Sequence, residues 1–265
     1  MQILLLNVLT GAVLALAVAF FSYKLKFLTF DGAVATFLLA VIIFGFGLLK
    51  WSVPVLTFFI PASMLSIKKT DTKLEISGLL EKPGSRNYIQ VLSNGGIAVV
   101  FIFLDYCTKS AVWYLSYVVY LAAMASDTWA TEIGTMKKRK TYNILTLRTC
   151  VQGESGGVSL TGFVAAFIGS VIVVLSSAFW VGNLSLLILI TLVGFSGSVA
   201  DSFLGAAVQA KYKCKICGLT TEKKIHCGEK TFLVKGKKWF NNDLVNITSG
   251  LLSVFILLLI YQLSF

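Results

Sequence analysis

Three acidic side chains interrupt long apolar runs of this chain: Asp127, Glu132 and Asp201. An ionised carboxylate is costly inside a bilayer, so an acid in a membrane-spanning segment is first of all a candidate functional residue. Asp127 lies ten residues before Lys137, and Asp201 lies ten residues before Lys211. In two helices of the same direction, both acids would lie at one depth, roughly 15 Å from the basic end. This arrangement predicts a magnesium site, since Mg²⁺ combines one or two carboxylates with phosphate oxygens and water.

Other uses of these acids stay open at this point. The carboxylates could be structural, or they could form a proton or ion pathway through the membrane. Glu132 follows Asp127 by five residues, which turns its side chain roughly 140° away on a regular helix. We therefore expect Glu132 to join the site only if the helix ends or unwinds near Gly134. The neighbouring hydroxyl residues that could bond structural acids are Ser126, Thr128 and Ser202.

Four glycine- and amide-rich stretches, 86–96, 153–162, 201–209 and 241–246, lie at the ends of apolar runs. Free backbone amides at helix N-termini favour phosphate, and glycine lets phosphate approach the backbone closely. No Walker pattern is present, and close helix packing is the other explanation for the glycines. The candidate substrate- and nucleotide-binding residues are Arg86, Gln90, Asn94, Gly95, Gly96, Ser155, Gly156, Gly157, Ser159, Ser202, Gly205, Gln209, Asn242, Asp243 and Asn246. Further side chains that could neutralise phosphate are Lys137, Lys138 and Arg148.

A second cluster gathers Cys214, Cys217, Cys227 and the single histidine, His226. In a reducing compartment these residues match a structural zinc set by type. His226 and Cys227 are adjacent, however, so free thiols and a redox pair remain alternatives. A metal here would fasten the segment 211–242 over one face of the membrane.

The elements that must position these residues are transmembrane helices. The hydrophobic fraction is 57%, and apolar runs recur along the whole chain. Runs of this length cross roughly 30 Å of hydrocarbon as helices, which predicts an all-α polytopic bundle. Pro54 and Pro61 fall within the third span, and an N-terminal signal peptide is disfavoured because no basic residue precedes the first run. The eight predicted spans are 3–21, 32–49, 51–67, 88–104, 111–135, 158–179, 184–210 and 244–263.

The basic residues orient these spans. If the N-terminus is outside, the inner segments 22–31, 68–87, 136–157 and 211–243 contain 2, 5, 5 and 9 of the 23 Lys and Arg residues. Such asymmetry predicts both termini outside and the candidate site on the cytosolic face of the inner, cytoplasmic membrane. We expect one transmembrane domain over 1–265, with a basic, Cys-rich cytosolic loop at 211–243. The net charge of +11 then reflects topology and anionic lipid, and we expect no nucleic-acid partner.

Five motifs occur in order along the chain, at 90–96, 126–134, 155–159, 201–209 and 242–246. Together they resemble the DUF92-type integral-membrane family that includes human transmembrane protein 19 and plant phytyl-phosphate kinase. The cysteine cluster also resembles that of the family. The resemblance implies phosphorylation of an isoprenyl monophosphate to the diphosphate by a nucleoside triphosphate, CTP or ATP, and a distant similarity to CTP-using polyprenol kinases. One departure is Glu154, an acid where a small hydroxyl residue is expected before Ser155.

The motifs and the acids together predict a membrane kinase with Mg²⁺ held by Asp127 and Asp201. Phosphoryl transfer needs metal, charge neutralisation and positioning more than covalent help from the protein. Catalytic roles are predicted for Asp127, Asp201, Asn94 and Glu132, with the prenyl tail between spans in the inner leaflet. Two other functions use the same residues: a CTP:lipid-phosphate cytidylyltransferase, and a transporter that couples ions to the two aspartates.

Overall fold

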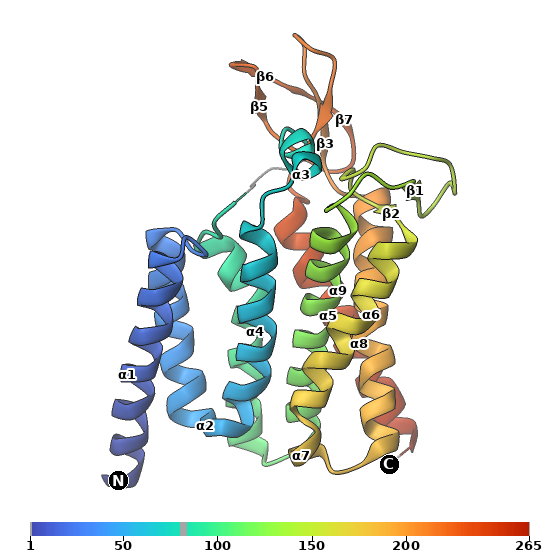
Figure 1. Ribbon diagram of the computed structural model, residues 1–265. Coiled ribbons are helices and arrows are strands. Elements are labelled where there is room, and N and C mark those ends of the chain that lie inside the picture. Colours follow the sequence, from blue (N-terminus) through green and yellow to red (C-terminus); the bar gives the residue numbers. More distant parts are fainter. Residues whose placement is uncertain (1, 80–83, 265) are drawn as a thin grey trace.

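The computed structural model describes residues 2–79 and 84–264, and helices make up most of them (Figure 1). Within the described residues, five helices are long and apolar enough to cross a membrane by length and composition: α1, α2, α4, α8 and α9. Residues near both chain ends lie at one end of the bundle, opposite the end that carries the β-strands. The helices of the described residues are α1 (Gln2–Lys24), α2 (Phe30–Ile67), α3 (Asp71–Ile76), α4 (Tyr88–Thr108), α5 (Val112–Gly134), α6 (Leu160–Ser176), α7 (Ala178–Val181), α8 (Leu184–Ala207) and α9 (Asn242–Ser264).

Helix α2 consists of two halves that run side by side in opposite directions (Figure 1). The halves meet at Leu48, whose φ of 52° and ψ of −152° are not helical. A Cβ atom at Gly47 would lie 2.5 Å from the Cβ of Trp51, so this reversal requires glycine. The predicted spans 32–49 and 51–67 therefore fall within one element. Its break comes two residues before the predicted boundary at Lys50 because Gly47 provides the space for the turn.

Helix α5 is the central helix of the bundle, packed against α2, α4, α6, α8 and α9. Its residues from Tyr114 to Ser126 are all buried, and the Tyr120 hydroxyl donates to the Ser93 carbonyl of α4 at 2.6 Å. Helix α5 is not among the five helices that are apolar enough to qualify as membrane spans, and its central position explains its more polar composition. A helix surrounded by other helices contacts little lipid, so it tolerates the polar residues that an exposed span would exclude.

Several helix boundaries differ from the predicted spans by a few residues. Ser159 accepts from the Gly162 amide at 3.2 Å, so α6 begins after it rather than at 158. The predicted span 158–179 then divides at Ser177 into α6 and the one-turn α7. Asn183 caps α8 through the Leu186 amide at 3.0 Å, as its predicted start at 184 requires, but α8 ends at Ala207 rather than at 210.

Short antiparallel strands correct the all-α prediction. The chain is mostly helical, but its polar loops form small sheets at one end of the bundle. Outside the hydrocarbon region, water can hydrogen-bond to the backbone, so non-helical structure is tolerated there. Strand β1 (Tyr142–Asn143) pairs with β2 (Gly157–Val158). The loop predicted at 211–243 contains a three-stranded sheet in the order β4-β3-β7 and a β5-β6 hairpin. Its strands are β3 (Lys211–Lys213), β4 (Thr220–Thr221), β5 (Ile225–His226), β6 (Glu229–Lys230) and β7 (Phe232–Lys235).

Candidate functional site

A polar cavity of about 800 Å³ opens at the end of the bundle that carries the strands. Its wall includes the second half of α2, the start of α4, the ends of α5 and α8, the start of α9 and the loop before α6. Most of the predicted site residues line it. They are Arg86, Gln90, Asn94, Asp127, Glu132, Ser155, Gly156, Gly157, Ser159, Asp201, Ser202, Gln209, Asn242, Asp243 and Asn246.

Close packing of α5 against α8 brings the two aspartates together. A Cβ atom at Gly194 would lie 2.6 Å from the Cβ of Ala122, and one at Gly197 would lie 2.5 Å from the Cβ of Ala123. Farther along the same interface, the Asp127 and Asp201 side chains are in hydrogen-bonding contact. Two adjoining carboxylates repel each other unless a proton or a cation lies between them. This pair therefore offers carboxylate oxygens, the ligand type that Mg²⁺ prefers.

Amide and hydroxyl groups of α4 and α9 surround the carboxylate pair. Ser249 donates to Asp201 Oδ2 at 3.2 Å, and Asn246 Nδ2 donates to Asn94 Oδ1 at 3.2 Å. Among the described residues, Asn246 Oδ1 is buried without a hydrogen-bond partner. A buried acceptor of this kind is costly unless a ligand, water or ion satisfies it. It therefore marks a position where the cavity can receive a donor or a cation.

Glu132 lines the cavity in the last turn of α5, which ends at Gly134, and so meets the condition expected from the sequence. Helix α5 stays helical to Gly134, and Glu132 forms an ion pair with Lys73 of α3 at 2.5 Å. Lys73 also donates to the Leu65 carbonyl at 2.7 Å. Glu132 thus lies in the wall of the cavity and ties α5 to α3 and the end of α2.

The predicted glycine cradle is wrong in part. Gly95 and Gly96 lie eight and nine residues after the α4 cap Asn87, beyond the free amides of the first turn, so neither amide can bind phosphate. The Gly157 amide donates to the Glu154 carbonyl at 2.8 Å and is likewise occupied. Gly156 has a left-handed φ of 79°, and a Cβ there would lie 2.4 Å from that of Ala206.

Gln90 and two further predicted residues have structural contacts. Gln90 and Asn87 form a reciprocal capping box at the start of α4. Ser159 caps α6, and Gly205 packs against the Gly156 backbone without lining the cavity. Helix capping thus explains why Gln90 and Ser159 are polar, and close packing explains the glycine at position 205.

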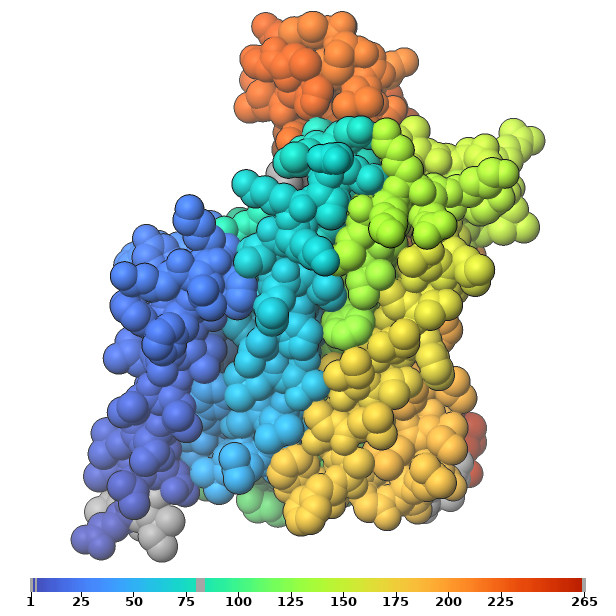
Figure 2. All heavy atoms as spheres, viewed as in Figure 1, coloured from blue at the N-terminus to red at the C-terminus, as the bar shows by residue number. Residues whose placement is uncertain are grey.

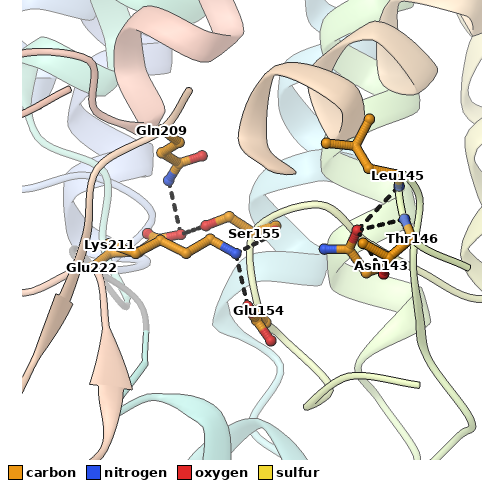
Figure 3. A network of polar contacts seen from close by, with 8 residues as sticks. All are labelled: Asn143, Leu145, Thr146, Glu154, Ser155, Gln209, Lys211 and Glu222. Atoms are coloured by element: carbon orange, nitrogen blue, oxygen red, sulfur yellow. Dashed lines mark hydrogen bonds and ion pairs between the residues drawn. The ribbon is translucent and has the colours of Figure 1, made fainter. Parts of the chain in front are cut away.

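A polar network joins the loop before α6 to the segment after α8 beside the cavity (Figure 3). Glu222 accepts from the Ser155 hydroxyl and, at 2.9 Å, from Gln209 Nε2. Lys211 Nζ lies 2.8 Å from Glu154 Oε1 and donates to the Ser155 carbonyl at 2.9 Å. Lys211 thus compensates the charge of Glu154, the acid that departs from the expected motif. Glu222 and Lys211 were missed because they come from a separate loop, and no sequence pattern links them to residues 154–155.

The basic lining also differs from expectation. Lys137, Lys138 and Arg148 lie outside the cavity wall, and Lys138 instead pairs with Glu75 at 2.9 Å on the exposed surface. Arg86 is 8% exposed and donates to the Ser66 hydroxyl at 3.3 Å. Burial lowers the pKa of the Arg86 guanidinium, and the charge of Glu132 opposes this shift. Of the described residues, the basic ones that line the cavity are Lys26, Lys68, Lys69, Lys73 and Arg86.

A smaller, apolar pocket of about 70 Å³ adjoins the polar cavity. The two share Arg86, Gln90 and Asn94 in their walls. The other lining residues come from α1, α2 and α4 and are almost all hydrocarbon, apart from Thr36, whose hydroxyl is buried without a partner among the described residues. The site therefore joins a polar chamber to an apolar one at a buried arginine.

The cysteine cluster lies outside this cavity, in the loop above it. The ligand atoms of Cys214, Cys217, His226 and Cys227 all lie within 4.8 Å of one another. His226 Nδ1 is 3.5 Å from Cys217 Sγ and 3.2 Å from Cys227 Sγ. Their adjacency in sequence therefore does not keep His226 and Cys227 from facing one point.

Comparison with known proteins decides the family. The family described as integral membrane protein DUF92 matches residues 13–254. The chain belongs to this family. Protein PGR of Arabidopsis thaliana is 29% identical over 272 residues, which cover 93% of each chain. An uncharacterized membrane protein of Methanocaldococcus jannaschii is 27% identical over 213 residues, covering 78% of this chain and 84% of that protein. Protein VTE6, chloroplastic, of Arabidopsis thaliana is 24% identical over 244 residues, covering 89% and 66%.

The match confirms the predicted family and the integral-membrane class. The residues that line the cavity of this DUF92 protein run from Leu25 to Asn246, all within the matched range. The four residues of the cysteine cluster fall within it as well. No solved structure matches the chain.

Proposed function

We propose that this DUF92 protein is a membrane-embedded kinase that phosphorylates an isoprenyl monophosphate, of phytyl or geranylgeranyl type, to the diphosphate with a nucleoside triphosphate. The observation that carries the proposal is the contact between Asp127 and Asp201 at a cavity whose wall also holds basic side chains, five of them among the described residues. Adjoining carboxylates beside cations suit a divalent metal and phosphates, the two requirements of phosphoryl transfer. The family resemblance supplies the substrate class.

The proposal includes a topology of eight crossings with both termini outside. Each half of α2 makes one crossing, and α1, α4, α5, α6, α8 and α9 make the others. The cavity then opens on the cytosolic side of the cytoplasmic membrane, where CTP or ATP is available. The excess of Lys and Arg in the loops at that end supports this orientation.

Charge neutralisation and positioning would be the work of the protein. Asp127 and Asp201 would hold Mg²⁺, which when bound neutralises charge on the donor phosphates. Arg86 and Lys73 would attract the phosphates, while Asn94 and Asn246 would orient oxygens by neutral hydrogen bonds. No general base is needed, because a monophosphate oxygen is already ionised near neutral pH. This agrees with the position of the single histidine in the cysteine cluster, away from the cavity wall.

The apolar pocket gives the lipid substrate an orientation. Its phosphate would lie at Arg86, and the first isoprene units would extend among Ala40, Ile43 and Phe44. The remainder of a long chain would continue between α1, α2 and α4 into lipid. Burial of hydrocarbon stabilises the complex by roughly 25 cal/mol per Å² of apolar surface, so chain length should affect KM more than kcat.

The test is product analysis by mass spectrometry with purified protein. Phytyl phosphate or geranylgeranyl phosphate is incubated with Mg²⁺ and either CTP or ATP. A prenyl diphosphate with a nucleoside diphosphate is the expected result. A CDP-lipid with pyrophosphate would identify a cytidylyltransferase instead. If neither product forms, while reconstituted vesicles show ion-coupled uptake that needs both aspartates, the protein is a transporter and the proposal fails.

A further inference from the structure

The loop module, residues 211–240, protrudes from the bundle and has almost no apolar core. Figure 2 shows it as the orange lobe above α3. Its strands are two to four residues long, and Ile216, Phe232 and Trp239 are exposed. Its well-buried side chains are few, Tyr212 at 5% exposed and Cys214 at 2% among them. Chains shorter than about 40 residues usually need a disulfide, a metal or a partner to fold stably.

We infer that a structural zinc ion bound by Cys214, Cys217, His226 and Cys227 holds this module together. A tetrahedral site with Zn–S of about 2.3 Å and Zn–N of about 2.0–2.1 Å has sulfur–nitrogen edges of roughly 3.6 Å. The His226 Nδ1 distances of 3.5 and 3.2 Å to two of the sulfurs are close to this value. All four ligand atoms fit within 4.8 Å, so one ion can contact each of them.

The backbone around the cysteines is shaped to present sulfur to an ion. The amides of Ile216 and Cys217 donate to the Cys214 sulfur, and the Gly218 amide donates to the Cys214 carbonyl at 3.1 Å. Gly218 follows Cys217 with a left-handed φ of 70°, which folds the chain back after the second ligand. Amide donors to sulfur are the supporting contacts that tune and orient thiolate ligands in metal sites.

The zinc site also bears on the cavity, because its two ligand pairs flank Glu222. Glu222 lies five residues after Cys217 and four before His226. Its backbone amide donates to the Leu79 carbonyl at 2.8 Å, and Thr221 donates to the Gly78 carbonyl at 2.9 Å. The metal would therefore close a short loop whose tip binds the turn after α3 and directs the Glu222 carboxylate to Ser155 and Gln209.

Glu222 is thus a positioning residue for the loop side of the cavity, and zinc fixes its place. This second part rests on the proposed kinase function, whereas the metal site itself does not. Zinc binding also uses all three thiols of the cluster, whereas one disulfide would leave the third unpaired. Binding free energy at such sites is folding free energy, so removing the ion should loosen the module and spare the bundle.

The test measures zinc in the full-length protein, purified in detergent without chelators, by inductively coupled plasma mass spectrometry. We expect about one zinc per chain in the wild type and below roughly a tenth of that in Cys214→Ser and Cys217→Ser. Cys107→Ser is the matched control, because Cys107 is a free cysteine at the opposite end of the bundle, and it should keep its zinc. Cobalt substitution should give thiolate-to-metal charge-transfer bands that the two cluster variants lack.

The two parts of the inference fail separately. A wild type that holds no zinc, and whose chelated form takes up neither zinc nor cobalt, overturns the metal site whatever its kinase activity. Zinc-loaded protein that forms no prenyl diphosphate would reject the proposed function and leave the site intact. If Glu222→Gln keeps its zinc and both kcat and KM of the wild type, the positioning role of Glu222 is rejected.

Discussion

The bundle interior and the loop module are held together in opposite ways. In the bundle, α5 packs on α8 through Ala122, Ala123, Gly194 and Gly197, and a continuous apolar core surrounds them. In the loop module, large hydrophobic side chains face solvent. Its fold is held by short paired strands, side-chain hydrogen bonds and the cysteine cluster. The site lies between the two. The rigid part supplies the two aspartates, and the part with little core supplies Glu222. A substitution in the bundle should therefore leave the loop module folded, and metal removal from the loop module should leave the bundle folded.

The largest expected effect comes from the acids that the bundle brings together. Asp127→Asn and Asp201→Asn should each lower turnover by more than about 100-fold, since metal-based charge stabilisation contributes several kcal/mol to phosphoryl transfer. Initial rates of prenyl diphosphate formation measure this, with thermal melting as the check on folding. Asp105→Asn, outside the cavity wall, is the control. Near-normal turnover in either variant would remove that aspartate from the mechanism.

Metal removal tests the other region. After chelation, trypsin should cleave within 211–240 about ten times faster or more, because the opened module exposes its lysines. Far-UV circular dichroism of the helices should hardly change. The readout is the rate of fragment appearance, with zinc-reloaded protein as the control. Equal cleavage rates with and without zinc would show that the module holds its fold without metal.

Packing of the bundle interior is broken by Gly197→Val. A Cβ at this position would lie 2.5 Å from the Ala123 Cβ and 2.7 Å from the Ser253 hydroxyl, so the helices must separate. We expect a loss of about 1–3 kcal/mol in stability and reduced turnover, because the same interface brings Asp127 to Asp201. Gly218→Ala, in the module, is the comparison and should leave the melting temperature of the bundle unchanged. A Gly197→Val protein of wild-type stability would show that this contact is not close in the folded protein.

The smallest effect sharpens the assignment of the apolar pocket. Thr36→Val removes a buried hydroxyl that has no partner among the described residues and keeps the side-chain shape. Removing an unsatisfied polar group should lower KM for the prenyl phosphate by several-fold, on the order of 1 kcal/mol, with kcat unchanged. Thr57→Val is the control, since its hydroxyl bonds the Val53 carbonyl at 2.9 Å outside this pocket. An unchanged KM would place the prenyl chain elsewhere.

Sequence patterns predicted the helices far better than the contacts of the site. The equal distance of Asp127 and Asp201 from a following lysine gave their common depth, because helical rise per residue is nearly constant. Gly95 and Gly96 show the limit of the same approach. Beside Asn94 they resemble a phosphate-binding loop. Helix α4 begins at Tyr88, however, so their amides form hydrogen bonds within the helix. The count of eight crossings and the outside position of both termini remain predictions.

The family, the membrane class and the two acid-bearing helices were determined by the sequence alone. Each of these features can be recognised in a short stretch of sequence. Apolar runs of membrane-spanning length, their basic flanking residues and the family motifs all depend on residues close together along the chain. Tertiary structure alone decided that Lys211 compensates Glu154, that Lys73 pairs with Glu132, and that Glu222 reaches Ser155. These pairs join residues more than fifty positions apart. Only the folded backbone sets such distances, and no periodicity along the chain encodes them.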